Sequence, residues 1–260
     1  MKSQVVITMP VFNEEFGINH FLEEIRESLV NYQLSIVIID DCSDDGTVDK
    51  VRKFKSEHPE IQLILIENEK NLGHGPSTLK GMALALSTNY ETILTIDGDG
   101  QFLGTDMVLA LDSFFSSQVD VLEGVRVKRS EPLFRKISTG AVKILVWSRS
   151  HKLPADGNTP FRIYPRSRLM ELISRLPADV LIPNVFISTY ARIKEWKILE
   201  MKVISIPSRG KNLLGSTWRQ RYTNLPSRRF LKFCLSAFLQ WRKVNIQYFE
   251  KDLRNSKPYN

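Results

Sequence analysis

Four short apolar runs in the first hundred residues constrain the fold of this 260-residue chain more than any other feature. They cover residues 5–9, 35–39, 62–66 and 92–96, and each is continuous and rich in β-branched residues. Runs that do not alternate with polar residues are typical of strands buried on both faces, as in parallel sheets. The sequence therefore predicts four buried strands before any motif is considered.

Segments with a helical pattern separate these runs, at residues 18–29, 47–54 and 77–86. Strand and helix thus alternate, and right-handed crossovers between parallel strands lead to a doubly wound sheet. We expect an α/β fold with a mostly parallel, Rossmann-like sheet. In such sheets ligands bind beyond the carboxyl ends of the strands, so the loops after the four runs are the ones to inspect.

The rest of the chain is less regular. The patterns predict helices over 105–115 and 133–147 and strands over 119–127 and 198–206. From residue 227 a basic amphipathic helix begins, with Phe230, Cys234, Phe238 and Trp241 at helical spacing. We expect one large domain over 1–225, followed by a basic helical extension over 226–260.

Charge is distributed unevenly along the chain. Residues 1–191 carry 20 Lys and Arg against 25 Asp and Glu, whereas the remainder carries 16 against 4. A basic tail suits an anionic lipid surface, while the acidic majority of the chain argues against a nucleic-acid partner. Two other interpretations remain open: the tail is merely solvated, or its apolar stripe packs on the core.

The sequence also bears on location. It has no signal-peptide pattern, no run of 18 apolar residues, and only two cysteines, Cys42 and Cys234, which indicates reduced thiols. We expect a cytoplasmic protein that associates peripherally with the inner face of the membrane.

The loops after the first two runs carry polar side chains suited to a nucleotide. Pro10, Asn13 and Glu14 follow the first run, and Asp41 and Asp45 follow the second. Carboxylates accept hydrogen bonds from ribose hydroxyls and base N–H groups. Each loop alone is also compatible with an ordinary helix start, since Asn and acidic residues favour that position.

The third and fourth loops add a phosphate site and a metal site. Asn71 and Gly73 precede a helix, where glycine lets the backbone approach a ligand closely. Asp97, Asp99 and Gln101 follow the fourth run, and two carboxylates beside a diphosphate form a site for a hard cation such as Mg²⁺ or Mn²⁺. The alternatives for this loop are a solvated turn and an isolated calcium loop, although the distal Glu of a calcium hand is missing.

Two other classes with related folds do not fit. A dinucleotide oxidoreductase needs Gly-x-Gly-x-x-Gly after its first strand, and here that turn reads Met-Pro-Val-Phe-Asn-Glu. A sugar nucleotidyltransferase needs a glycine-rich loop ending in arginine at the same place. His74 and His151 are candidate proton carriers, although an isolated histidine is more often structural.

Taken together, these motifs resemble the family 2 inverting glycosyltransferases of GT-A fold, particularly the dolichyl- or polyprenyl-phosphate mannosyltransferase-like branch. The resemblance runs from about Val5 to Trp218 and includes the later segment Asp-Gly-Asn-Thr-Pro-Phe-Arg at 156–162. It departs from the branch at Thr159 and Pro160, where Ser-Gly is usual, and in a late loop around Arg209 that lacks the usual Ser-Lys pair. These departures affect the predicted identity of the acceptor more than the predicted transfer reaction.

The resemblance implies roles for individual residues. It implies that the nucleotide sugar, a GDP- or UDP-sugar, contacts residues from all four loops and beyond: Pro10, Val11, Asn13, Glu14, Asp41, Asp45, Asn71, Gly73, Lys80, Asp97, Gly98 and Arg209. Asp97, Asp99 and Gln101 form the implied metal site. The implied catalytic residues are Asp99, Asp156, Arg126 and Arg135, and the implied acceptor contacts are Arg129, Arg135, Ser138 and Arg162.

The nature of the acceptor decides what Asp156 does. A sugar hydroxyl needs a general base, for which Asp156 is the candidate, whereas a polyprenyl phosphate is already an anionic nucleophile. The basic tail and the resemblance favour the lipid phosphate, with a hydroxyl as the alternative. A non-catalytic nucleotide-sugar-binding protein is a third possibility. Inversion at the anomeric carbon is expected for either acceptor, because a single displacement forms no covalent intermediate.

Overall fold

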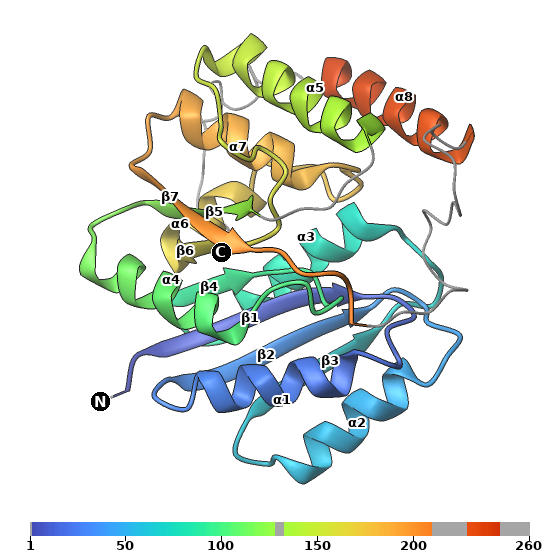
Figure 1. The fold of residues 1–260 in the computed structure, drawn as a ribbon, viewed down its shortest axis with the longest axis vertical. Helices are drawn as coiled ribbons and strands as arrows, with labels where there is room; N and C mark the ends of the chain where they lie inside the picture. The colour runs from blue at the N-terminus through green and yellow to red at the C-terminus, as the bar shows by residue number, and fades with distance from the viewer. Residues whose placement is uncertain (1, 128–132, 210–227, 245–260) are drawn as a thin grey trace, which may run out of the picture.

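The computed structural model describes residues 2–127, 133–209 and 228–244, with residues 133–137 as backbone only. Within these ranges a single mixed sheet runs through the middle of the molecule, and helices cover both of its faces (Figure 1). Seven strands build the sheet: β1 (Gln4–Val11), β2 (Gln33–Asp40), β3 (Gln62–Glu67), β4 (Thr92–Thr95), β5 (Val121–Val127), β6 (Arg162–Pro165) and β7 (Ile198–Ile204).

The strand order is β3-β2-β1-β4-β6-β5-β7. Strands β1 to β4 pair in parallel, and so do β5 and β7. Only β6 is antiparallel, and it joins β4 to β5. The carboxyl ends of the other six strands therefore meet at one edge of the sheet, which confirms the expected mostly parallel α/β fold.

Two helical layers bury the two faces of the sheet (Figure 1). On one face lie α1 (Ile18–Ser28), α2 (Thr47–Glu57) and α4 (Gly104–Ser116). On the other lie α3 (His74–Ala85), α6 (Arg166–Ile173) and α7 (Pro183–Ile193), with α5 (Leu133–Ser150) and α8 (Arg228–Lys243) packed outside them. No helix in the described part of the chain is long and apolar enough to span a bilayer.

Strand β1 shows why the continuous apolar runs form central strands. Val5, Ile7 and Met9 enter the core beneath α1 and α4, while Val6 enters the core beneath α3 and α7. Successive side chains of a strand point to opposite faces, so both faces need apolar residues when both are covered. The runs at 5–9 and 35–39 meet this requirement.

Three elements were not predicted from the sequence. Strand β6 is only four residues long, begins with Arg162 and ends with a proline, so it lacks an apolar run. Helix α6 was missed, and so was α7, whose sequence contains the β-branched residues Val185, Ile187 and Thr189. Ten of the eleven residues of α7 are buried, and burial on this scale overrides a weak intrinsic helix propensity.

A buried ion network joins β5, β6 and α7. Glu123 lies 2.8 Å from Arg192 Nη2 and 3.3 Å from Arg162 Nη2, and all three side chains are at most 5% exposed. Arg192 also reaches Glu200 at 2.8 Å. A single carboxylate thus compensates two buried guanidinium groups at the junction where the antiparallel strand enters the sheet.

We predict that Glu123→Ala lowers the free energy of unfolding by about 3–5 kcal/mol, because it leaves the buried Arg162 without its paired carboxylate and leaves Arg192 with Glu200 alone. Glu67→Ala is the matched control, since Glu67 also lies in a strand and pairs with Arg52, but both of those side chains are largely exposed. That pair contributes only about 0–1 kcal/mol. Urea unfolding of both variants measures the difference, and equal losses would contradict a structural role for the network.

Candidate active site

The loops after β1, β2, β3 and β4 gather at the carboxyl edge of the sheet, and hydrogen bonds between them fix their shape. Asn13 joins the first loop to the second: its Nδ2 donates to Asp44 Oδ1 at 2.7 Å, and its Oδ1 accepts from Asp44 N at 3.0 Å. Its backbone N–H also donates to Ser43 Oγ. Asn13 has φ 55°, a left-handed conformation that Asn tolerates better than most residues.

Asp45 strengthens the same junction. Its Oδ1 accepts hydrogen bonds from the backbone N–H and the hydroxyl of Thr47, and its Oδ2 accepts from the backbone of Glu15. Thr47 in turn accepts from the backbone N–H of Glu14 at 2.8 Å. In the structure Asp45 thus shapes the start of α2, and its implied contact with the nucleotide remains a prediction.

Asp41 performs the same task for the third loop. Its buried carboxylate accepts from the backbone N–H groups of Leu72 and Gly73, at 2.8 and 2.9 Å, and from the side chains of Asn68 and Ser77. These four donors hold the segment that leads into α3. The sequence predicts that Asp41 reads the base or ribose; the structure uses most of its hydrogen-bonding capacity for its own chain.

The start of α3 carries three of the predicted donor contacts. Asn71 donates to the carbonyl of Asp41, and Gly73 adopts φ 90°, a conformation that favours glycine. Lys80 lies one and a half turns into the helix and donates to Asn68 Oδ1 at 2.6 Å. The N-terminus of α3 therefore lies at the edge where a diphosphate is expected.

The fourth loop lies beside the first. Gly98 N donates to the carbonyl of Pro10, and a Cβ on Gly98 would come within 2.3 Å of Val11 Cγ1, so only glycine allows this contact. Asp97 Oδ1 lies 2.8 Å from His74 Nε2. Asp99 accepts from the backbone N–H of Gln101 at 3.2 Å.

Carboxyl side chains gather where the first and fourth loops meet. Burial and the nearby Asp99, Asp45 and Asp97 raise the pKa of Glu14 to about 8. Burial and Asp97 raise the pKa of Asp99 to about 7. The charge of Asp97 raises the pKa of His74, whose side chain is about half exposed. The carboxyl groups of this site thus disfavour one another's ionisation.

These residues fit a divalent cation. Glu14 Oε2 is buried and has no hydrogen-bond partner among the described residues. Asp97 and Asp99 supply hard oxygen donors, and the local excess of carboxylates favours a positive charge. No group of three His, Cys, Asp or Glu side chains in the described ranges forms a complete metal cage. The arrangement therefore suits Mg²⁺ or Mn²⁺ held by two carboxylates, with the remaining ligands from a diphosphate and water.

On the other side of the edge, Arg126 and Asp156 form a bidentate pair. Arg126 Nε donates to Asp156 Oδ2 at 2.7 Å, and Nη2 donates to Oδ1 at 2.9 Å. Arg126 also binds the carbonyl of Asn158. Both side chains are largely buried, and a fork-to-fork pair of this kind fixes their orientation. The structure thus brings together two catalytic candidates, Arg126 in β5 and Asp156 in the loop before β6.

Arg209 lies beside the fourth loop but points away from the donor side. Its backbone N–H donates to the carbonyl of Asp99, and its Nε donates to the carbonyl of Gly100. The guanidinium forms an ion pair with Glu24 of α1 and lies 3.0 Å from His20 Nδ1. In this structure Arg209 connects the fourth loop to α1, and its implied contact with the donor remains a prediction.

Of the four predicted acceptor residues, Arg162 and Ser138 have side chains within the described ranges. Arg162 is fully buried within the sheet, where it donates to the carbonyl of Asn184 and pairs with Glu123. Its guanidinium is closed off from solvent, so its expected contact with the acceptor is replaced by a structural role. Ser138 is half-buried on α5. Arg129 and the side chain of Arg135 lie outside the described residues.

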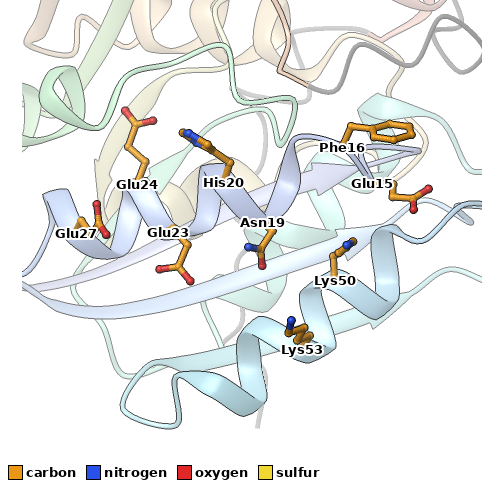
Figure 2. A pocket seen from close by; sticks show the side chains of 9 residues that line it. All are labelled: Glu15, Phe16, Asn19, His20, Glu23, Glu24, Glu27, Lys50 and Lys53. Atoms are coloured by element: carbon orange, nitrogen blue, oxygen red, sulfur yellow. The ribbon is translucent and has the colours of Figure 1, made fainter.

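A groove between α1 and α2 begins at Glu15 of the first loop and runs along α1 to Glu27, away from this edge (Figure 2). Figure 2 shows Glu23 and Glu27 on α1 above Lys53 on α2. Glu23 is already paired with Arg26 and His58. The acidic wall does not suit a diphosphate, so the groove is not the donor site.

Residues 6–167 match the family model described as glycosyl transferase family 2, which covers more than half of the chain. The chain belongs to glycosyl transferase family 2. The match includes all four loops and the segment that contains Asp156. The predicted enzyme class, a nucleotide-sugar glycosyltransferase, is thereby confirmed.

Relatives within this family extend the comparison. An uncharacterised protein of Methanocaldococcus jannaschii is 31% identical over 175 residues, covering 65% of this chain and 74% of that protein. The undecaprenyl-phosphate 4-deoxy-4-formamido-L-arabinose transferase of Pectobacterium atrosepticum is 24% identical over 77% of this chain, and the match spans 59% of that enzyme's length. The UDP-N-acetylglucosamine–dolichyl-phosphate N-acetylglucosaminyltransferase of Methanococcus voltae is 23% identical over 67% of this chain and 74% of the enzyme.

Solved structures of other glycosyltransferases share the fold. Glucosyl-3-phosphoglycerate synthase from Mycobacterium tuberculosis, in complex with Mn²⁺ and UDP-glucose, aligns over 92% of this chain and 79% of its own. Its TM-score is 0.62 and its sequence identity 13%. A mannosyltransferase from Pyrobaculum calidifontis, in complex with GDP-mannose and Mn²⁺, has a TM-score of 0.54, 18% identity and coverage of 98% and 65%. These likenesses confirm the GT-A fold.

Sequence reasoning missed several residues that hold the site together. Asn68 and Ser77 anchor Asp41, and Thr47 anchors the first loop. Asn68 stands directly after β3, a position equivalent to the motifs of the other loops, and could have been found by that criterion. Glu24, which pairs with Arg209, carries no such signal because it lies on a helix distant in sequence.

We predict that the metal-free protein becomes less stable as the pH rises from about 4.5 to about 8. Glu14 is protonated over this window in the folded protein but ionised in the unfolded chain, so the unfolded state binds fewer protons and the free energy of unfolding falls. Glu14→Gln should reduce this decline, and Mn²⁺ should do the same for the wild type. Thermal unfolding across this pH range compares wild type and Glu14→Gln in chelator, and the wild type again with Mn²⁺ in place of the chelator. Identical pH profiles for wild type and variant in chelator would contradict the charge cluster.

Proposed function

We propose that this glycosyltransferase transfers a sugar from a nucleotide diphosphate sugar to a polyprenyl phosphate, with inversion and with a divalent cation at Asp97 and Asp99. The observation that carries the proposal is the group of carboxyl side chains at the junction of the first and fourth loops. Glu14, Asp97 and Asp99 meet there, opposite the N-terminus of α3, and the raised pKa values of Glu14 and Asp99 reflect how strongly their joint ionisation is disfavoured in the absence of a cation.

The donor would occupy the carboxyl edge of the sheet. Its diphosphate would lie between the N-terminus of α3 and the fourth loop, where backbone N–H groups and a cation both favour negative charge. When bound, the cation supplies positive charge against the departing nucleoside diphosphate. The two solved relatives were crystallised with UDP-glucose and GDP-mannose, which supports either a uridine or a guanosine nucleotide.

The reaction needs no covalent intermediate. An oxygen of the acceptor phosphate forms a bond to the anomeric carbon while the bond from that carbon to the donor diphosphate breaks. The electron pair of the broken bond leaves with the nucleoside diphosphate. One displacement inverts the anomeric configuration.

The pairing of Asp156 with Arg126 supports the lipid phosphate as acceptor. Arg126 binds both oxygens of Asp156, an arrangement that fixes the guanidinium and that removal of a proton from a hydroxyl would not require. An ionised phosphate does not need a general base, so Asp156 would instead hold Arg126 beside the acceptor phosphate. The names of the Pectobacterium and Methanococcus relatives point to the same acceptor class.

This acceptor also places the protein at a membrane. A polyprenyl phosphate keeps its chain in the bilayer, so its enzyme must work at the surface. We propose a peripheral location on the cytoplasmic face, supported by the basic C-terminal part of the chain.

We predict that Asp99→Asn lowers transfer at least about 100-fold while the protein stays folded, because a cation that offsets leaving-group charge contributes several kcal/mol to the transition state. Asp49→Asn on α2 is the control, since Asp49 is exposed and should leave the rate unchanged. Release of nucleoside diphosphate, with and without chelator, reports the rate. A fully active Asp99→Asn, or a wild type insensitive to chelator, would rule out the metal assignment.

Asp156→Asn separates the two acceptor classes. With a phosphate acceptor we expect the variant to keep an appreciable kcat, and we expect its acceptor KM to change more than its kcat. If the acceptor is a sugar hydroxyl, which is the alternative that Asp156 itself suggests, loss of the general base should cost ~10²- to 10⁴-fold in kcat. Both constants are measured at saturating donor, with circular dichroism and donor affinity as controls. A folded, donor-binding but inactive variant would count against the phosphate.

A further inference from the structure

Helix α8 is apolar on two sides, and only one of them is used within the chain. Ala237 and Trp241 are buried, and Trp241 packs against Phe186 with a ring separation of 4.9 Å. Gln240 receives a hydrogen bond from the backbone of Leu181 and donates one to the carbonyl of Asp179. These contacts fix the rotation of α8 about its axis, so its other side must face outward.

The outward side of α8 carries large apolar residues. Leu231, Leu235, Phe238 and Leu239 are between 45% and 59% exposed. Their spacing of four, three and one residues places them on one stripe of the helix. Sequence reasoning assigned Phe238 to the same stripe as Trp241; the structure divides them, with Trp241 in the core and Phe238 at the surface.

Helix α5 extends this stripe. The two helices lie side by side at the top of the molecule in Figure 1, and Arg149 of α5 donates to the backbone carbonyls of Trp241 and Val244. Alongside, α5 exposes Ile144 and Trp147, at 62% and 48%. We define the outer face of α5 and α8 by these two residues and the four exposed apolar residues of α8.

Positive charge borders this outer face. Helix α8 contains five basic residues and no acidic one, and the sequence of α5 has no acidic residue either. The basic residues of α8 stand at its two ends and one turn in: Arg228, Arg229, Lys232, Arg242 and Lys243. A helix with Leu and Phe on one side and Lys and Arg beside them is typical of segments that lie in the plane of a bilayer surface.

We propose that the outer face of α5 and α8 docks on a bilayer surface that contains anionic phospholipid. Aliphatic and aromatic side chains would enter the headgroup region, and the flanking lysines and arginines would bind lipid phosphates. This inference names the surface through which the protein would contact a membrane. It rests on the proposed function in one respect, the choice of a lipid bilayer as the partner.

The charge argues against a second copy of the chain as the occupant. Two such faces packed together would bring five basic residues of each α8 against five of the other, with no acidic residue on either helix to offset them. Like charges at an interface are unfavourable, whereas an anionic lipid surface complements them.

The test is sedimentation of the full chain with vesicles of phosphatidylcholine alone and of equimolar phosphatidylcholine and phosphatidylglycerol. We expect binding to the anionic vesicles, weakened by salt. Leu235→Asp with Leu239→Asp should lower that binding at least about tenfold, because two apolar side chains lose their burial. Leu109→Asp with Met170→Asp is the matched control, since these residues are similarly exposed on α4 and α6 and the charge change is the same.

Binding that survives in the α8 double variant, or equal loss in the control, would overturn the assignment. So would a wild-type dimer in sedimentation velocity that the α8 variant converts to a monomer, because the face would then bind a second copy. Release of nucleoside diphosphate with a short, water-soluble prenyl phosphate is measured on the same samples. That rate should be unchanged in the α8 variant, so a failure of vesicle binding is distinguished from a failure of the proposed reaction.

Discussion

The structure depends on how the carboxylates at the carboxyl edge of the sheet divide between two tasks. Asp41 and Asp45 are satisfied by donors of their own chain and hold the loops in place. Glu14, Asp97 and Asp99 are held close together by those loops although they repel one another. Concentrating like charge in this way is unfavourable for folding, and under the proposed function a cation bound with the donor diphosphate would relieve it. Stability and ligand binding are therefore coupled at this edge.

Local sequence patterns predicted the framework well because the central strands are defined by local composition. The runs at 5–9 and 35–39 are long, apolar and β-branched, and both faces of the sheet are covered. Strand β6 could not be found in this way. Its four residues become a strand only by pairing with β4 and β5, and those contacts are distant in sequence.

The same limit applies to the site. The positions of the loops follow from the topology, so Asp97 and Asp99 could be placed at the edge with Asn13 and Glu14. The tasks of individual side chains could not be predicted, because their partners come from other loops. Asp41 is a clear example: the motif indicates a nucleotide contact, yet four donors from the third loop surround its carboxylate.

Three arginines to which the resemblance gives functional roles have different environments. Arg162 is buried with Glu123, and Arg209 connects the fourth loop to Glu24. Arg126 orients Asp156 near the expected acceptor. Each is paired with a carboxylate of its own chain, so phosphate binding by an arginine is decided by local competition and not by residue type. Only Arg126 combines a position at the strand ends with a partner that is itself a catalytic candidate.

The most direct test of the account is transfer of labelled sugar from GDP- or UDP-sugars into material extractable with organic solvent, in the presence of polyprenyl phosphate. The account predicts a lipid-linked product that requires Mg²⁺ or Mn²⁺ and one nucleoside diphosphate released for each sugar transferred. Transfer to a sugar hydroxyl with none to the lipid, or lipid transfer that continues at full rate in excess chelator, would contradict it.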